Sequence, residues 1–439
     1  MKKKYQYLLV FIIYTLLTYI YSFHIAKMTG DEIWNYGFAY NIYHGLIPYR
    51  DFNMILTPLY PITILPMFML FNDSIKIFHI YNALIVGIML TLAYKKIGIK
   101  SLILYPIIIL GYVPSYNLFS LFLYIVLLEI NTTKSKRKDI YIGLIISLIF
   151  LTKQTIGIAL LIPGLIESKN KKKTIISFII PILLIMIYLM LNNALYQFID
   201  YCFLGMLSFT DNNKTFSIYS IITISISIYF IYKMLKTRKI KYLYGVAFQI
   251  ITIPIADKYH FFVGLCALVY VFLIENTISK KMVLYLILFT NITLLSILGL
   301  KYITDKEQAY HYETNDILKN RTITEDQENY LNNYNTCLNI IKQDKNKKLF
   351  VLSSNAYFLK LVNHQTINKF DLINNGNMGY KGYLGYIEEI DKICKKENCI
   401  FIVENYKEED LGQTNKQIIE YPKEKYNLKY SVGQFSIYE

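Results

Sequence analysis

The sequence is poor in charged residues, and this scarcity excludes an ordinary soluble domain. Only 18% of its 439 residues are Asp, Glu, Lys or Arg, whereas 54% are hydrophobic. Apolar runs long enough to cross a bilayer recur from residue 5 to about residue 300. The composition therefore predicts a polytopic α-helical membrane protein.

Cysteine and tryptophan are also scarce. The five cysteines are odd in number and lack the spacing of metal-ligand pairs, so we expect neither a disulfide framework nor a zinc site. Trp34 is the single tryptophan, and it suits the aromatic belt of a membrane interface better than a sugar-stacking platform, which stays open as an alternative.

Acidic residues are few in the first 300 positions, and this accounts for the net charge of +15. Residues 301–439 hold nearly equal numbers of basic and acidic side chains, so the positive excess lies between the apolar runs. Lys and Arg gather in short cytoplasmic loops of membrane proteins. The charge therefore does not indicate a nucleic-acid partner.

The basic clusters predict a cell-membrane protein with a cytoplasmic N-terminus. No small-residue cleavage site follows the apolar run at 5–25, so we expect an uncleaved first span that delivers a first loop, residues 27–74, to the outer face. If the apolar piece 54–71 crossed the bilayer, every basic loop cluster between residues 95 and 241 would lie outside. A re-entrant or interfacial 54–71 places them all inside.

This topology predicts about eleven transmembrane helices. Several are shorter than the roughly 20 residues that a bilayer core requires, so we expect them to be buried among neighbours. They are the first span and the segments 75–94, 100–113, 115–130, 140–152, 154–167, 174–192, 217–235, 242–256, 259–275 and 282–300.

The polar residues 301–439 predict a separate extracytoplasmic α/β domain after a transmembrane domain of residues 1–300. Thr324-Glu-Asp-Gln327 is typical of a capping box that begins a helix. Short apolar runs at 348–352, 399–403 and 435–438 predict strands, with a helix at about 386–396.

Ionisable residues that are not basic cytoplasmic anchors gather at the predicted outer ends of the spans. Such groups are costly at a membrane unless they pair, meet water or bind a ligand. They are Asp31, Glu32, Arg50, Asp51, Lys153, Asp257, Lys258 and His260.

Three of these residues suggest chemistry at the membrane surface. Lys153 lies between two apolar helices and could anchor an anionic lipid phosphate, or it could be an interfacial lysine that reaches water. Asp31 and Glu32 emerge directly from a span, where a carboxylate could take a proton from an attacking hydroxyl. A solvated acidic loop end would explain the same pair.

The remaining polar positions have two readings each. Arg50 and Asp51 could form an ion pair that shapes the loop, or Arg50 could bind phosphate. His260 could belong to a capped helix start or form a hydrogen bond to a phosphate or leaving group. A divalent metal held by Asp31, Glu32 and one of His24, His44 or His79 is a further alternative.

The first loop resembles that of the GT-C superfamily, the membrane glycosyltransferases that use polyprenyl-phosphate sugars and include protein O-mannosyltransferases and aminoarabinose transferases. The resemblance rests on Gly30-Asp31-Glu32, Pro48-Tyr-Arg50-Asp-Phe52 and Pro58-Leu-Tyr60-Pro61. The turns at Leu151–Gln154 and Pro254–His260 are similar to later outer-face motifs. Thr57 stands where a double proline is usual.

The resemblance implies an inverting sugar transfer from a polyprenyl-phosphate donor to a hydroxyl acceptor on a glycolipid, envelope polymer or protein. It implies Asp31 as catalytic base beside Glu32. Arg50, Lys153, Lys258 and His260 would bind the donor phosphate, and a membrane lipid would be a further partner. Loop shape is expected to depend on Asp51, Pro58, Tyr60 and Asp257.

Two other function classes stay open. An O-antigen-type polymerase or ligase would be expected to use arginines of a large outer loop, and Arg50 is almost alone there. A lipid-linked sugar transporter or flippase would place ionisable residues at mid-membrane. The glycosyltransferase hypothesis requires Asp31, Lys153 and His260 to share one outer cavity.

Overall fold

The computed structural model describes residues 3–213, 216–276, 278–304, 309–311, 317–342, 346–356, 368–374, 376–406 and 414–439. Within these ranges the first 304 residues are almost entirely helical. Their helices are α1 (Lys3–Tyr19), α2 (Gly30–Tyr43), α3 (Leu59–Leu70), α4 (Ile75–Ile97), α5 (Leu104–Leu110), α6 (Tyr116–Ile130), α7 (Lys138–Phe150), α8 (Gln154–Glu167), α9 (Lys171–Leu191), α10 (Leu195–Ile199), α11 (Met206–Asn213), α12 (Ile218–Thr237), α13 (Lys241–Phe248), α14 (Lys258–Glu275) and α15 (Lys280–Thr304).

The helices lie near the predicted segments, but fewer of them are long enough to cross a bilayer. In the described ranges, five helical segments have the length and apolar character of membrane spans: Lys3–Ile25, Ile75–Leu110, Lys171–Leu191, Ile218–Thr237 and Lys258–Glu275. Others, including α6 and α8, are shorter apolar helices. The structure therefore supports a helical membrane protein but not eleven spans, because apolar composition alone overcounts short helices that are packed among neighbours.

The segment that was expected not to cross the bilayer forms α3, a helix of 12 residues with Pro66 inside it. At about 1.5 Å per residue, such a helix is too short to span a hydrocarbon core. Its C-terminal end exposes Met69, Leu70 and Phe71.

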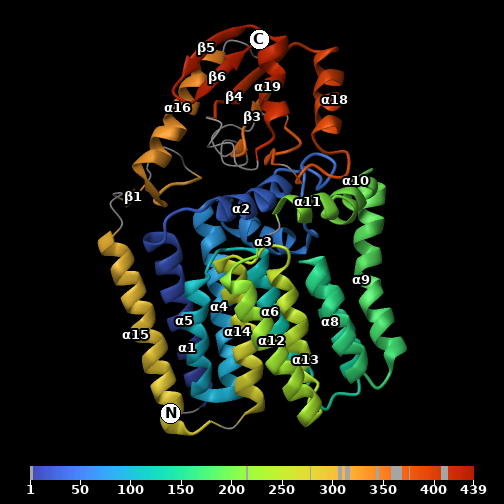
Figure 1. Ribbon diagram of the computed structural model, residues 1–439, viewed down its shortest axis with the longest axis vertical. Coiled ribbons are helices and arrows are strands. Elements are labelled where there is room, and N and C mark those ends of the chain that lie inside the picture. Colours follow the sequence, from blue (N-terminus) through green and yellow to red (C-terminus); the bar gives the residue numbers. More distant parts are fainter. Residues whose placement is uncertain are drawn as a thin grey trace.

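Three layers are visible in Figure 1. The long helices form a bundle, α2, α10 and α11 lie across one end of it, and the C-terminal sheet with its helices stands beyond them. Within the bundle, α1 packs along α4 at Gly87, where a Cβ atom would lie 2.1 Å from Oγ1 of Thr15. The close approach of these two helices therefore depends on the missing side chain.

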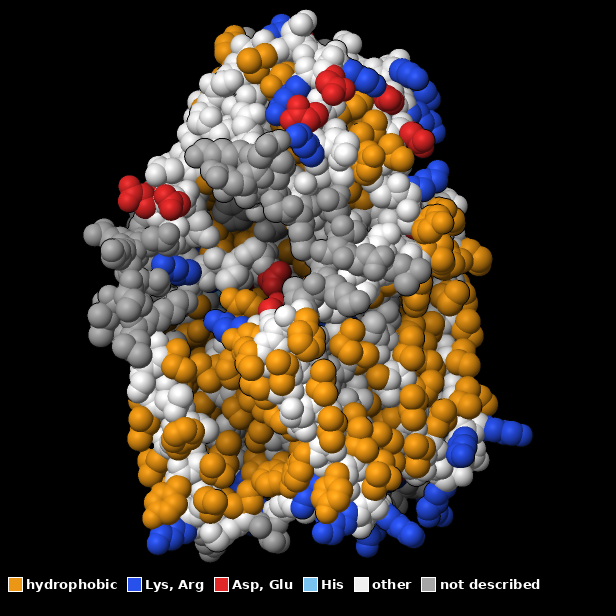
Figure 2. Space-filling model, in the orientation of Figure 1, with side chains coloured by type: hydrophobic (Ala, Val, Ile, Leu, Met, Phe, Trp, Pro, Cys, Tyr) orange, Lys and Arg blue, Asp and Glu red, His pale blue; other side chains and the backbone are white. Residues whose placement is uncertain are grey.

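The two ends of the bundle differ in charge. Figure 2 shows hydrophobic side chains over the flank of the bundle, and Lys and Arg side chains along the rim farthest from the C-terminal sheet. This distribution is typical of a membrane protein that exposes an apolar belt to lipid.

The C-terminal residues fold around a four-stranded sheet in the order β3-β4-β6-β5. Strands β3 and β4 are parallel, and β6 is antiparallel to both β4 and β5. The predicted strands and the capping box of Thr324 and Gln327 are confirmed. The elements are β1 (Ala309–His311), β2 (Thr322–Thr324), α16 (Glu325–Ile341), β3 (Lys348–Leu352), α18 (Gly382–Cys394), β4 (Cys399–Glu404), α19 (Lys416–Lys425), β5 (Leu428–Val432) and β6 (Phe435–Tyr438).

Both faces of the sheet are covered. Val351, Ile402 and Ile437 pack in the same cluster as buried residues of α16, whereas Phe350 and Phe401 face the cluster that contains buried residues of α18 and α19. This alternation explains why β3 and β4 are apolar throughout, since successive side chains of a strand point to opposite faces.

One expectation about cysteine is wrong. Cys394, the last residue of α18, forms a disulfide with Cys399, the first residue of β4. Their Cα atoms are 5.5 Å apart, which the short connection between helix and strand makes attainable. The odd number of cysteines concealed this local pair.

Candidate functional site

The first turn of α2 presents two consecutive carboxylates. The hydroxyl of Thr29 caps the helix by accepting the backbone N–H of Glu32 at 3.2 Å, as expected for a threonine at this position. Asn35 donates its side-chain amide to the carbonyl oxygen of Asp31 at 2.8 Å. Asp31 is exposed to solvent, whereas Glu32 is only 2% exposed.

Lys153 lies in the tight turn between α7 and α8. A Cβ atom on Gly157 would lie 2.4 Å from the Cα atom of Phe150, so the turn requires glycine at this position. The carbonyl oxygens of Phe150 and Leu151 accept hydrogen bonds from the Thr57 hydroxyl at 2.7 Å and the Leu59 N–H at 2.8 Å. The start of α3 and the Lys153 turn are thus fixed to each other.

A chain of hydrogen bonds links Lys153 to α14. The Nζ atom of Lys153 donates to Oδ1 of Asn117 at 3.0 Å, and Nδ2 of Asn117 lies 3.2 Å from Nε2 of His260. Nδ1 of His260 lies 2.9 Å from Oδ1 of Asp257. A neutral imidazole with its proton on Nδ1 satisfies every partner, because Nε2 then accepts from the Asn117 amide.

Asp31, Lys153 and His260 lie around two adjoining pockets. Asp31 and His260 line a pocket with a cavity volume of about 10 Å³, and Lys153 and His260 line one with a cavity volume of about 40 Å³. Tyr116 and His260 belong to both pockets. Neither of these two pockets holds all three residues, so in place of the expected single cavity the structure has two pockets that meet at Tyr116 and His260.

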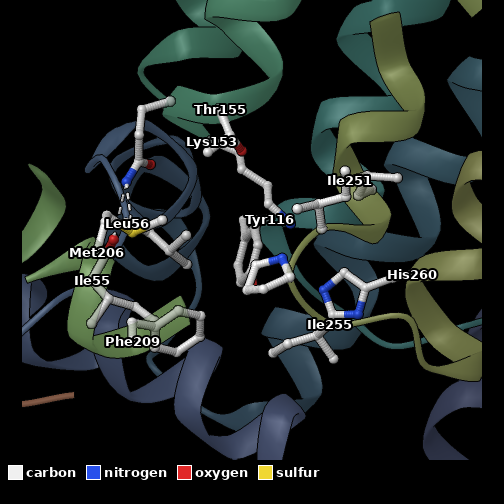
Figure 3. A pocket seen from close by; sticks show the side chains of 13 residues that line it. Ile55, Leu56, Tyr116, Lys153, Thr155, Met206, Phe209, Ile251, Ile255 and His260 are labelled. Atoms are coloured by element: carbon white, nitrogen blue, oxygen red, sulfur yellow. Dashed lines mark hydrogen bonds between the residues drawn. The ribbon is translucent and has the colours of Figure 1, made fainter. Parts of the chain in front are cut away.

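The lining of the second pocket is mostly apolar. In Figure 3, Met206 and Phe209 lie on one side of Tyr116 and His260 lies on the other, with Ile251 and Ile255 beside it. Nζ of Lys153 is 5.4 Å from the centre of the Tyr116 ring, close enough for a cation–π contact. A cation beside an apolar wall suits a ligand with an anionic head and an apolar tail.

The surroundings of Asp31 and Lys153 change their proton affinities. Protein atoms surround the carboxylate of Asp31 on most sides, and this desolvation raises its pKa; His260 opposes the shift and Asp257 adds to it. Burial lowers the pKa of Lys153 to about 7, against the effect of Asp257. Asp31 is thereby a stronger base than an ordinary aspartate, and Lys153 gains most from an anionic ligand.

Glu32 lies in a different environment, which sequence reasoning missed. Arg321 donates from Nε to Oε1 of Glu32 at 2.7 Å and from Nη2 to Oε2 at 2.8 Å, and Nε2 of His79 lies 2.9 Å from Oε1. Burial opposes ionisation, but Arg321 and His79 lower the pKa of Glu32 to about 2. Both oxygens are engaged, so the structure favours a structural role for Glu32 over the expected catalytic one.

Arg50 and Asp51 form the ion pair that was one of their two readings. Nε and Nη2 of Arg50 donate to the two carboxylate oxygens of Asp51 at 2.8 and 2.9 Å. Asp51 also accepts the N–H of Ile47 at 2.7 Å. Arg50 lines neither of the two pockets described above, and its contact with a donor phosphate stays a prediction.

The other expected loop residues have local roles. Pro58 precedes α3, and the hydroxyl of the buried Tyr60 donates to Oδ1 of Asn82 at 2.9 Å. Asp257 caps α14 by accepting the N–H of His260 at 2.8 Å. Lys258 places its Nζ atom 5.0 Å from the centre of the Tyr259 ring and lines neither pocket.

The metal alternative does not fit the carboxylates as they are placed. Glu32 faces Arg321 and His79 and does not share a ligand position with Asp31. Among the described residues, no group of three or more His, Cys, Asp or Glu side chains has the arrangement of a metal site.

No family model matches this sequence, and no curated protein matches it either. The GT-C resemblance of the first loop thus rests on its sequence motifs alone.

Two residues of the site, Asn117 and Arg321, were not expected. Asn117 is a neutral amide at the start of an otherwise apolar helix, and a polar residue in such a helix is itself a signal. Arg321 lies 289 positions after Glu32, so no local pattern could pair them.

Proposed function

We propose that the chain is a membrane glycosyltransferase that transfers a sugar from a polyprenyl-phosphate donor to a hydroxyl acceptor. The observation that carries this proposal is the meeting of Asp31 with the Lys153–Asn117–His260–Asp257 chain around adjoining pockets. A base and an anion-binding cation at the end of an apolar bundle are the groups that such a transfer requires.

The proposed reaction is a displacement at the anomeric carbon. The acceptor oxygen forms a bond to that carbon while its proton passes to the carboxylate of Asp31. The bond between the anomeric carbon and the phosphate oxygen breaks, and its electron pair stays on the departing polyprenyl phosphate. Lys153 stabilises the charge that grows there, and Asn117 and His260 hold its ammonium group in place. The apolar wall with Met206 and Phe209 receives the lipid tail.

We place this site at the extracytoplasmic face. The basic rim lies at the other end of the bundle, where the positive-inside rule puts the cytoplasm (Figure 2). A disulfide in the C-terminal unit also favours an oxidising compartment for that end.

Transfer of label from polyprenyl-phosphate sugars tests the proposal. Membranes that contain the wild type, Asp31→Asn or Lys153→Ala are incubated with each radiolabelled donor. Asp73→Asn and Lys76→Ala are matched controls, since Asp73 lies at the end of the first loop, Lys76 is an exposed residue in the first turn of α4, and neither lines the two pockets. We expect transfer by the wild type and both controls, and loss in the two site variants at equal protein level. Equal label with empty membranes for every donor would overturn the proposal.

A further inference from the structure

A third cleft lies between the start of α2 and the C-terminal unit. Its cavity volume is about 280 Å³, close to the lower end of the roughly 300–1,000 Å³ that is common for small-molecule sites. Its walls come from Met28, Gly30 and Ile33 on one side and from Asp326 and Asn355 on the other. Figure 2 shows a hollow with acidic side chains between the bundle and the sheet.

The polar wall of this cleft is held by contacts behind it. The hydroxyl of Tyr330 donates to Oε2 of Glu404 at 3.0 Å, and the ring of Tyr330 stands edge-on to Phe435 at 5.2 Å. Gln327 donates its side-chain amide to the carbonyl oxygen of Met28 at 3.2 Å. The two walls are therefore joined, and the aromatic ring has a fixed orientation before any ligand binds.

The chemistry of the lining selects a neutral, polyhydroxylated ligand. Asp326 can accept from two hydroxyl groups, and the amide of Asn355 can both donate and accept. The ring of Tyr330 offers an apolar face with a polar edge, which matches the mixed surface of a sugar ring.

Two other ligand classes fit less well. No Lys or Arg belongs to the described lining, and the carboxylate of Asp326 would repel a phospholipid headgroup. An extended peptide needs a free strand edge, but the lining residues lie in helices and turns.

We infer that this cleft is a saccharide-binding site that holds the acceptor, so that the acceptor is a glycan. The claim that the bound saccharide is the acceptor rests on the proposed function, whereas the claim that the cleft binds a saccharide does not. Gly30 lines this cleft, and Asp31, the next residue, lines the pocket that contains His260. The start of α2 thus separates a saccharide cleft from the phosphate-binding side, with the proposed base between them.

Saturation-transfer difference NMR on the full chain in lipid nanodiscs, without glycoside detergents, tests this inference. The probes are the methyl glycosides of glucose, galactose, mannose and N-acetylglucosamine. We expect saturation transfer to at least one of them, and a signal at least fivefold weaker in Asp326→Asn/Asn355→Ala. The matched control Glu325→Gln/Asn329→Ala changes exposed neighbours on α16 outside the lining, so it should keep the signal.

Three results would overturn the inference: no transfer to any glycoside, equal transfer in the cleft variant and the wild type, or a cleft-dependent signal with a serine-containing peptide or glycerol phosphate instead. Equal thermal unfolding of the two double variants excludes loss of fold as the cause. Tyr330→Phe should keep binding and Tyr330→Ala should weaken it, because the ring is the contacting group.

The failure of this inference differs from the failure of the proposed function. Binding requires no donor, so the wild type should bind the glycoside in nanodiscs that contain no polyprenyl-phosphate sugar. Glycoside binding without sugar transfer would support the saccharide site and contradict the proposed transferase function. Sugar transfer without glycoside binding would support the transferase function and contradict the saccharide site.

Discussion

Asp31 and Glu32 are neighbours in one helical turn, yet their surroundings on the two sides of α2 shift their pKa values in opposite directions. On one side, Asp31 faces a pocket with His260, and desolvation raises its pKa. On the other, Glu32 is buried; burial would raise its pKa, but Arg321 and His79 more than offset this and hold it at about 2. Consecutive residues of a helix point about 100° apart, so one turn can serve both surroundings.

This contrast distinguishes a carboxylate with a proposed catalytic role from one with a structural role. A carboxylate with a raised pKa and an open side is available to a substrate, whereas one that is paired on both oxygens is part of the framework. Substitutions on the two sides should therefore affect different measurements, and each of the following experiments tests or refines that distinction.

The largest effect is expected from Asp31→Asn. Removing a general base costs about 10²–10⁴-fold in rate, and the asparagine should leave the thermal unfolding of the protein unchanged. Initial rates of sugar transfer in purified membranes, with unfolding midpoints measured on the same samples, check both expectations. A parallel loss of stability would mean that Asp31 is also part of the framework.

Glu32→Gln should act on stability first. It leaves the buried guanidinium of Arg321 without its anionic partner, and breaking a buried ion pair typically costs about 3–5 kcal/mol. Unfolding in detergent with increasing denaturant measures this loss.

A paired replacement sharpens this test. Glu32→Met/Arg321→Met removes both charges and should regain most of the lost stability. If the double variant is as unstable as Glu32→Gln, packing and not charge explains the loss.

The next effect concerns the pH dependence of donor binding. The pKa of Lys153 is about 7, so its protonated fraction falls about tenfold from pH 6 to pH 8. We therefore expect the KM for the donor to rise by up to about tenfold over this interval. The rise is smaller where the bound phosphate keeps Lys153 protonated. In Lys153→Arg, which stays protonated, the KM should be flat. A wild-type KM that does not change with pH would show that Lys153 does not contact the donor.

The smallest effect is expected from Arg50→Ala. Exposed ion pairs between neighbours contribute little, so transfer should stay within about twofold of the wild type and the unfolding midpoint should not move measurably. The same transfer assay is sufficient. A loss of more than about tenfold would show that Arg50 reaches the donor phosphate after all.

Local patterns predicted part of the C-terminal unit. The capping box located the start of α16, and short apolar runs located β3, β4 and β6, whereas α2, α19 and β5 were not predicted. The number of spans could not be predicted in the same way, since composition does not distinguish a short helix buried among others from one that faces lipid.

The site could be predicted only in part. Ionisable residues at one end of the spans pointed to Asp31, Lys153 and His260, because charge at a membrane is rare enough to be informative. The partners of Glu32 and the role of Asn117 depend on contacts across the fold, and the disulfide depends on one short connection. Sequence spacing contains none of these distances.

The contact between Glu32 and Arg321 also has a meaning for biosynthesis. The helix that carries Asp31 leaves the ribosome 289 residues before the arginine that fixes its neighbour. Domains form in order during synthesis, so the bundle inserts while Glu32 still lacks its guanidinium partner. An unfinished chain would therefore carry Asp31 while the neighbouring Glu32 still lacks the guanidinium that pairs with it.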